Sequence, residues 1–171
     1  MIVVAGPPGS GKSTAFPVQS EGVDFFNADN RAAELNGGSF QNIPPDIRNR
    51  VNREFEDFIN QRIDSRSSFA FETTLRTSVT CVQARHAYAH GFHRLMTYVG
   101  LNSAEECIQR VMNRAHHGGH SAPAELIRQS YAASIQNLGG PLNGSAACTS
   151  MTTALLTNRR AWLRCRYNRS R

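Results

Sequence analysis

The sequence has almost no lysine. Of its 19 Lys and Arg residues, 18 are arginine, and Lys12 is the only lysine among 171 residues. Arginine and lysine differ in shape, hydration and flexibility. Because the chain prefers arginine so strongly, a single lysine is expected only where its ammonium group is needed. A compact cation that can follow a moving anion is one such need. Lys12 is therefore the first candidate functional residue.

Long apolar runs and paired cysteines are also missing. No run approaches the ~20 residues that span a bilayer, so we expect no membrane association. The N-terminal apolar run is too short for a signal peptide. The four cysteines (Cys81, Cys107, Cys148 and Cys165) show no C-x-x-C spacing, which favours reduced thiols and a cytoplasmic location. The length and 40% apolar content suit one soluble domain with a sizeable core.

Acidic residues are absent after Glu125. The last 13 residues contain six arginines, and without them the chain has 13 basic and 13 acidic residues. The net charge of +6 therefore belongs to the C-terminal tail rather than to the domain. Trp162 and Tyr167 could stack on bases there, but the basic excess has no folded framework, so we expect no nucleic-acid partner.

Residues 6–13 match the phosphate-loop pattern G-x-x-x-x-G-K-[ST] at every position. The preceding run 1–5 is apolar and β-branched, which predicts a buried strand. Glycines let backbone N–H groups approach a phosphate. We expect Lys12 to reach the β- and γ-phosphates of ATP or GTP and Ser13 to bind Mg²⁺. The expected nucleotide-binding residues are Gly6, Pro7, Pro8, Gly9, Ser10, Gly11, Lys12, Ser13 and Thr14.

Strand and helix patterns alternate along the chain. Apolar runs predict strands, and apolar residues at helical spacing predict helices. The predicted strands are 1–5, 23–27, 68–74 and 94–99. The predicted helices are 12–16, 31–36, 47–66, 77–90, one opening after Ser103, and 124–137. This alternation indicates a parallel sheet built from βαβ units.

Two acids lie at strand ends, where ligands bind in open α/β sheets. Asp29 follows the strand 23–27, and we expect it to face the phosphate loop; its alternative role is to cap the next helix. Glu72 ends the strand 68–74. It could bind a substrate hydroxyl or hold Mg²⁺ through water, as could Asp29, and its alternative is a packing or capping acid.

Three histidines lie close together at His116, His117 and His120. They could suggest a metal site, but no cysteine accompanies them and two glycines interrupt their spacing, which does not fit the usual zinc ligand patterns. We expect a mobile lid turn instead.

Together these segments resemble the zeta-toxin-like P-loop kinases over residues 1–139. The motifs that carry the resemblance are residues 6–13, 27–29, 68–74, 98–101, Arg110 with Arg114, and 118–120 followed by Pro123, Ile127, Tyr131, Ser134 and Asn137. The resemblance implies a three-layer α/β fold of the P-loop nucleoside-triphosphate hydrolase type, with a mostly parallel sheet flanked by helices. It also implies ATP- or GTP-dependent phosphorylation of a hydroxyl on a small molecule, which in zeta toxins is a UDP-N-acetylamino sugar.

The resemblance assigns roles to single residues. Asp29 would be the base that takes the substrate's hydroxyl proton, and Glu72 with Thr73 would contact the substrate. Mg²⁺ would be the metal, and an antitoxin protein is the partner that the family implies. The cations that would close over the phosphates are Lys12, Arg110, Arg114 and Arg128.

The resemblance stops before residues 140–171. This tail has little periodicity, and we expect it to be irregular and to leave the sheet with an open edge. One back-translation of residues 150–154 reads, in a shifted frame, as the Tyr-Asp-Asn-Ser stretch with which the family continues. We therefore hypothesise that the tail is a frameshifted reading.

Two other functions compete with a kinase. A nucleotide hydrolase or motor ATPase usually carries an apolar strand that ends in an aspartate for Mg²⁺, and the strand 94–99 ends without an acid. A non-catalytic protein could bind nucleotide, or nucleic acid through its basic tail.

Overall fold

The computed structural model describes residues 1–15, 22–115, 122–139, 151–156 and 160–166. Its strands are β1 (Ile2–Ala5), β2 (Asp24–Phe26), β3 (Phe69–Thr73), β4 (Leu95–Gly100), β5 (Met151–Leu156) and β6 (Arg160–Arg166). Its helices are α1 (Lys12–Ala15), α2 (Ala28–Leu35), α3 (Pro45–Asp64), α4 (Val79–Ala89), α5 (Ala104–Ala115) and α6 (Ala124–Gly139).

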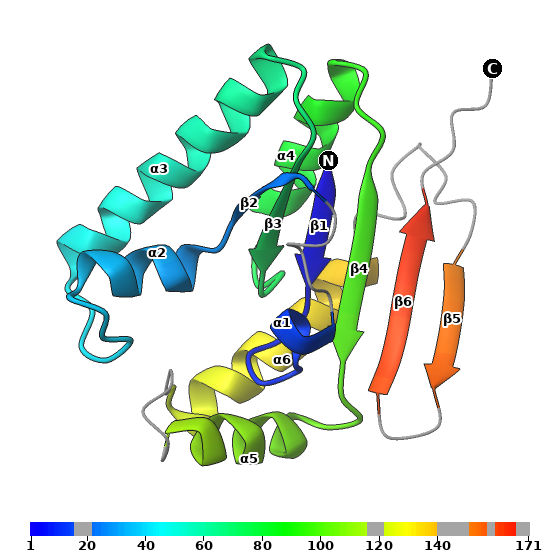
Figure 1. The fold of residues 1–171 in the computed structure, drawn as a ribbon. Coiled ribbons are helices and arrows are strands. Elements are labelled where there is room, and N and C mark those ends of the chain that lie inside the picture. The colour runs from blue at the N-terminus through cyan, green and yellow to red at the C-terminus, as the bar shows by residue number, and fades with distance from the viewer. Residues whose placement is uncertain (16–21, 116–121, 140–150, 157–159, 167–171) are drawn as a thin grey trace.

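The strands form one sheet in the order β2-β3-β1-β4-β6-β5 (Figure 1). The pairs β2–β3, β3–β1 and β1–β4 are all parallel. This confirms the predicted α/β P-loop fold with its parallel sheet and flanking helices. Because β1 is central, its carboxyl end lies between the ends of β3 and β4, so the loop that follows it is surrounded by neighbouring strand ends.

Alternate residues of β1 and β3 pack into different core clusters. Val3 and Phe71 belong to the largest cluster, which includes Ile59 of α3. Val4 and Ala70 belong to a separate cluster. This period of two is what a strand buried on both faces requires, and it explains why β1 and β3 are continuous apolar runs.

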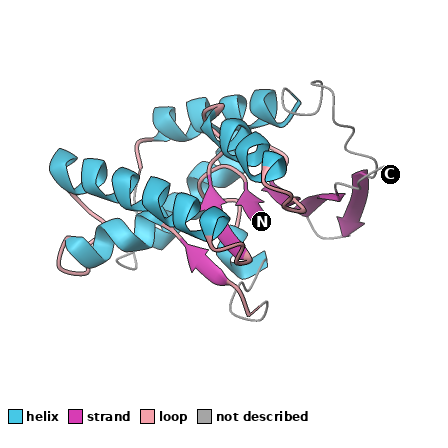
Figure 2. Ribbon diagram, turned by 90° about the horizontal axis from the view of Figure 1, so that it is seen from above, coloured by secondary structure: helices cyan, strands magenta, loops and turns pink. Residues whose placement is uncertain are grey.

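The C-terminal segment is not irregular where the structure describes it, so that expectation was wrong. Strands β5 and β6 pair antiparallel with each other, and β6 pairs antiparallel with β4. Figure 2 shows this hairpin at one side of the molecule. The edge of β4 is therefore covered, which pairs backbone groups that would otherwise remain open. The domain boundary at residue 139 and the frameshift stay predictions.

Helix boundaries lie close to those predicted, with one informative difference. Helix α2 begins at Ala28, three residues before the predicted start, because the Asn27 side chain accepts a hydrogen bond from the Asn30 N–H at 3.0 Å. The predicted lid turn and its histidines fall largely in 116–121, outside the described residues. Within the described part of the chain, no helix has the length and apolar character to cross a membrane.

Candidate active site

The phosphate loop runs from Gly6 to Gly11, between the end of β1 and the start of α1. Its backbone packs closely against β4 and α5. A Cβ on Gly6, whose φ is +146°, would lie 2.1 Å from the Val99 carbonyl oxygen on β4. A Cβ on Gly9, at φ +79°, would lie 2.5 Å from the carbonyl oxygen of Cys107 on α5. Glycine is therefore required at both positions by conformation and by space.

Lys12 is folded back into this loop. Its Nζ donates hydrogen bonds to the carbonyl oxygens of Gly6 at 2.8 Å and Pro7 at 3.1 Å, and only 6% of the residue is exposed. Burial lowers the pKa of Lys12, and the nearby Glu72 carboxylate opposes that change. The ammonium group is thus held at the loop with its charge partly balanced.

Glu72 connects the loop to the neighbouring strands. It lies on β3 opposite Val4 of β1, and its Oε1 is 3.4 Å from Lys12 Nζ. Its Oε2 accepts hydrogen bonds from Ser13 Oγ at 3.4 Å and from Asn27 Nδ2 at 3.1 Å. The structure therefore brings together Lys12, Ser13 and Glu72, which the sequence predicted as site residues.

The oxygen atoms of Ser13 and Glu72 fit a magnesium site. A hydroxyl and a carboxylate are the hard oxygen ligands that Mg²⁺ prefers, and Mg²⁺ usually keeps water and substrate phosphates as its other ligands. Among the described residues there is no cluster of three or more His, Cys, Asp or Glu side chains that could hold a metal. Ser13 and Glu72 are the side chains that would hold a metal at this position.

Asp29 lies in the first turn of α2 and is exposed. Its negative charge helps to keep Lys12 protonated, after the larger effects of burial and of Glu72 on the pKa of Lys12. In the described part of the chain, no side chain forms an ion pair with Asp29. Asn27 is the N-cap of α2. The capping role considered as an alternative for Asp29 therefore belongs to Asn27.

Of the three predicted arginines, one contacts the loop. Arg110 on α5 donates from Nη1 to the Ser10 carbonyl oxygen at 3.5 Å, and the same atom lies 3.4 Å from the position of a Cβ on Gly11. Arg128 instead pairs with Glu105 at 3.0 Å and with Glu125 at 3.8 Å.

Among the described residues, the side chains of Arg114 and Thr73 do not contact the phosphate loop, although the Thr73 carbonyl oxygen accepts the Gly6 N–H at 3.2 Å. Arg114 is exposed in the last turn of α5 and has no ion-pair partner among the residues described. The Thr73 Oγ1 accepts the Leu75 N–H at 3.1 Å and lies 3.4 Å from Thr80 Oγ1. Its hydroxyl therefore supports the turn after β3.

The remaining loop residues differ in exposure. Pro7 and Ser10 are buried, Pro8 is half-buried, and Thr14 is exposed in α1. The Ser10 Oγ has no hydrogen-bond partner in the part of the chain that the structure describes. An unpartnered buried hydroxyl is costly.

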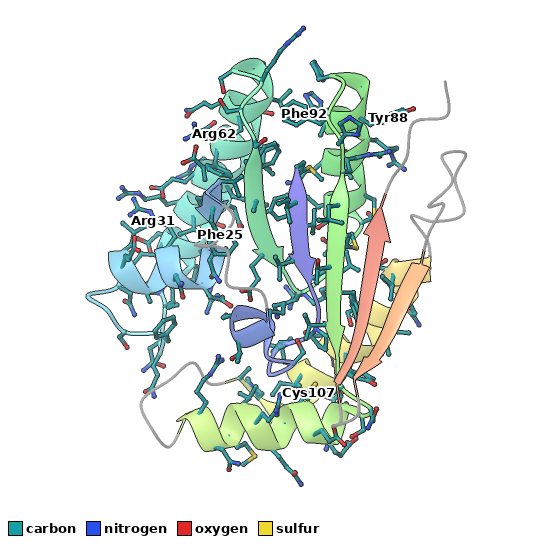
Figure 3. The ribbon with its side chains drawn as sticks, turned by 45° about the vertical axis from the view of Figure 1, so that its right-hand side comes forward. Phe25, Arg31, Arg62, Tyr88, Phe92 and Cys107 are labelled. Carbon is teal, nitrogen blue, oxygen red and sulfur yellow. The ribbon has the colours of Figure 1, made fainter. Side chains whose placement is uncertain are left out.

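Two residues were missed as parts of the site. Asn27 binds Glu72 and caps α2; the sequence placed it at the end of a predicted strand and in the 27–29 motif but gave it no role of its own. Cys107, labelled in Figure 3, lies on α5 where that helix meets Gly9. No local sequence pattern indicates that α5 packs on the loop.

Comparisons with known proteins bear on the fold and the family of this chain. A curated relative, described as an uncharacterized protein of Haemophilus influenzae, is 26% identical over 131 residues, which are 76% of this chain and 91% of that protein. A chain from the structure of the Pnkp1/Rnl/Hen1 RNA repair complex is similar in fold, with a TM-score of 0.61 and 18% identity. That match covers 90% of this chain and 52% of the other, so this chain spans about half of its length.

A gluconokinase from Sinorhizobium meliloti 1021 is 18% identical over 84% of this chain and 96% of its own, with a TM-score of 0.41. Residues 1–136 match the family described as "AAA domain". This range contains the phosphate loop, Asp29, Glu72 and Arg110. The chain belongs to this AAA domain family, AAA_33, and its phosphate loop implies that it binds a nucleotide.

Proposed function

We propose that the protein is a kinase that transfers the γ-phosphoryl group of ATP or GTP to a hydroxyl of a small molecule. The observation that carries the proposal is the meeting of Lys12, Ser13 and Glu72 at the ends of β1 and β3. Phosphoryl transfer is catalysed mainly by positioning and by neutralising charge, and these side chains supply a cation and two oxygen ligands for a metal.

Each residue has a distinct role in this proposal. Lys12 would bind the β- and γ-phosphates, and Ser13 with Glu72 would hold Mg²⁺, which neutralises phosphate charge when it is bound. Arg110, already against the loop, would add a second positive charge. Asp29 would orient the acceptor hydroxyl and take its proton. Arg114 and Arg128 would have to turn from their present positions to take part.

The acceptor is the finer part of the proposal. The resemblance to zeta-toxin-like kinases suggests a UDP-N-acetylamino sugar, with an antitoxin as a protein partner. The family match and the solved structures support the phosphate-loop domain rather than this choice, so the acceptor must come from an unbiased screen.

The test incubates the protein with Mg-ATP or Mg-GTP and a panel of UDP-sugars and other alcohols, and detects the phosphorylated product by mass. We expect one acceptor class to gain a phosphoryl group. Lys12→Ala and Asp29→Asn should each lower turnover at least about a hundredfold, the range for losing a charge-stabilising group or a base. Near-normal turnover by Asp29→Asn would remove Asp29 as the base.

A nucleotide hydrolase is the second candidate. The sequence counted against it because the strand 94–99 has no terminal acid, but β3, which also neighbours β1, carries Glu72 within 3.4 Å of Ser13. Steady phosphate release without an acceptor product would favour hydrolysis over transfer.

A further inference from the structure

We propose that Asn27 is a positioning residue that couples the phosphate loop to the helix that carries Asp29. The inference rests on the proposed function, because it assigns a consequence to nucleotide binding at Lys12 and Ser13. It adds a residue for which the sequence patterns predicted no role.

The side chain of Asn27 uses both ends of its amide. Its Oδ1 accepts the Asn30 backbone N–H at 3.0 Å and so caps α2. Its Nδ2 donates to Glu72 Oε2 at 3.1 Å. One short side chain therefore joins the first turn of α2 to the carboxylate at the end of β3. The register explains why this is possible, since Phe26 pairs with Phe71, and Asn27 and Glu72 are the residues that follow these two in the chain.

Glu72 extends this connection to the loop. Its other close partners are Lys12 Nζ and Ser13 Oγ, each at 3.4 Å. Its side chain is 16% exposed, so water can replace these partners only to a limited extent. A continuous series of polar contacts thus runs from the loop, through Glu72 and Asn27, to the residue next to Asp29.

Nucleotide binding must redistribute these contacts. Lys12 and Ser13 are the loop side chains expected to turn toward phosphate and metal, and each would then share or lose its contact with Glu72. Asn27 would remain as the contact that holds Glu72 from the other side. The carboxylate and the Asn27 amide can then adjust together, and the first turn of α2 responds because the same amide caps it.

The Arg31 side chain, just beyond Asn30 in the chain, ties α2 to α3. Arg31, labelled in Figure 3, donates from Nε to Glu54 of α3 at 2.6 Å. A change transmitted through Asn27 should therefore concentrate in the first turn of α2 rather than displace the whole helix.

The choice of variant separates coupling from capping. Serine is about as good an N-cap as asparagine, so Asn27→Ser keeps the cap, but its short hydroxyl side chain lacks the amide that reaches Glu72. Asn27→Asp also keeps a capping oxygen and removes the donor, and it serves if the serine variant does not fold. Asn30→Ala is the matched control, since it changes the same turn of α2 without removing a contact to Glu72.

The experiment measures amide hydrogen exchange over residues 28–35 in the wild type and the variants, with and without Mg²⁺ and a non-hydrolysable ATP analogue. Analogue binding is measured in parallel by calorimetry. In the wild type and in Asn30→Ala we expect a nucleotide-dependent change in exchange in the first turn of α2. In Asn27→Ser the analogue should still bind, but this change should shrink at least about threefold, because exchange reports local opening.

An equal nucleotide-dependent change in Asn27→Ser and in the wild type would overturn the inference. So would a wild type that binds the analogue without any change in residues 28–35. A wild type that does not bind the analogue at all would instead overturn the proposed function, and the inference with it. Calorimetry distinguishes these failures.

Discussion

The Glu72 carboxylate on β3 lies 3.4 Å from the ammonium nitrogen of Lys12, next to the loop that is expected to hold phosphate. An acid at this position has two opposite effects on a nucleotide. It repels the phosphates and competes for Lys12, but it can also hold the metal that neutralises them. Its net effect should therefore depend on whether Mg²⁺ is present.

Glu72→Gln should separate these two effects. Without Mg²⁺, we expect the variant to bind ATP roughly three- to tenfold more tightly, because a partly solvated repulsive charge is removed. With Mg²⁺, it should bind ATP more weakly than the wild type and lose most of its turnover. Calorimetric titration with ATP, with and without EDTA, measures the two affinities.

The matched control is Asp24→Asn, which removes an exposed acid that pairs with Arg62 away from the loop. This variant should bind ATP as the wild type does under both conditions. An affinity for Glu72→Gln that shifts in the same direction with and without Mg²⁺ would argue against a metal role for Glu72.

The contact between Gly9 and α5 gives a prediction for the loop. Gly9→Ala should impair nucleotide binding and lower stability, because the new Cβ would meet the Cys107 carbonyl oxygen at 2.5 Å and the backbone has φ +79°. Gly37→Ala has a similar φ of +65° but open space around it, so it should show only the conformational cost of about 1 kcal/mol. Equal melting temperatures for the two variants would contradict this account.

The packing of β3 gives a second stability prediction. Phe71 is fully buried, and its ring centroid lies 5.1 Å from that of Phe55 on α3. Phe71→Ala should cost about 3–5 kcal/mol of unfolding free energy in urea titrations. Phe25, on the neighbouring edge strand, is 38% exposed, so Phe25→Ala should cost no more than about 1 kcal/mol. Similar losses would show that the core lies elsewhere.

Burial raises the pKa of the Cys107 thiol from 9.0 to about 11. The unfolded thiol then ionises before the folded one, so stability is intact below pH 9 and falls as the pH rises from 9 to 11. A shift of two pKa units corresponds to at most about 3 kcal/mol. The stability difference between the wild type and Cys107→Ala should therefore decrease across this range. A difference that stays constant from pH 8 to 11 would refute the prediction.

Local sequence patterns predicted the strands and helices whose apolar residues follow a regular spacing. The apolar runs of β1, β3 and β4 and the long helix α3 lie within two or three residues of their predicted bounds. The start of α2 was placed too late because Asn27 and Asp29 are both good capping residues, and only the fold shows which side chain reaches the free N–H groups.

The pairing of β6 with β4 joins residues more than 60 positions apart, and nothing in the run of Thr, Ser and Arg indicates that partner. Residue types and spacing predicted Lys12 and Ser13 as site residues. The sequence did not decide which acid lies next to these two residues, because that depends on strand order. The sequence offered both Asp29 and Glu72, and the parallel register of β3 on β1 places Glu72 next to Lys12.

The rarity of lysine has a practical consequence for chemical modification. Any reagent or enzyme that acylates ε-amino groups has one target in the whole chain, and that target is enclosed by the carbonyl oxygens of Gly6 and Pro7. Lysine acetylation would neutralise the charge on which phosphate recognition depends. A single mass increment on Lys12 would thus report that the loop has opened far enough to expose this nitrogen.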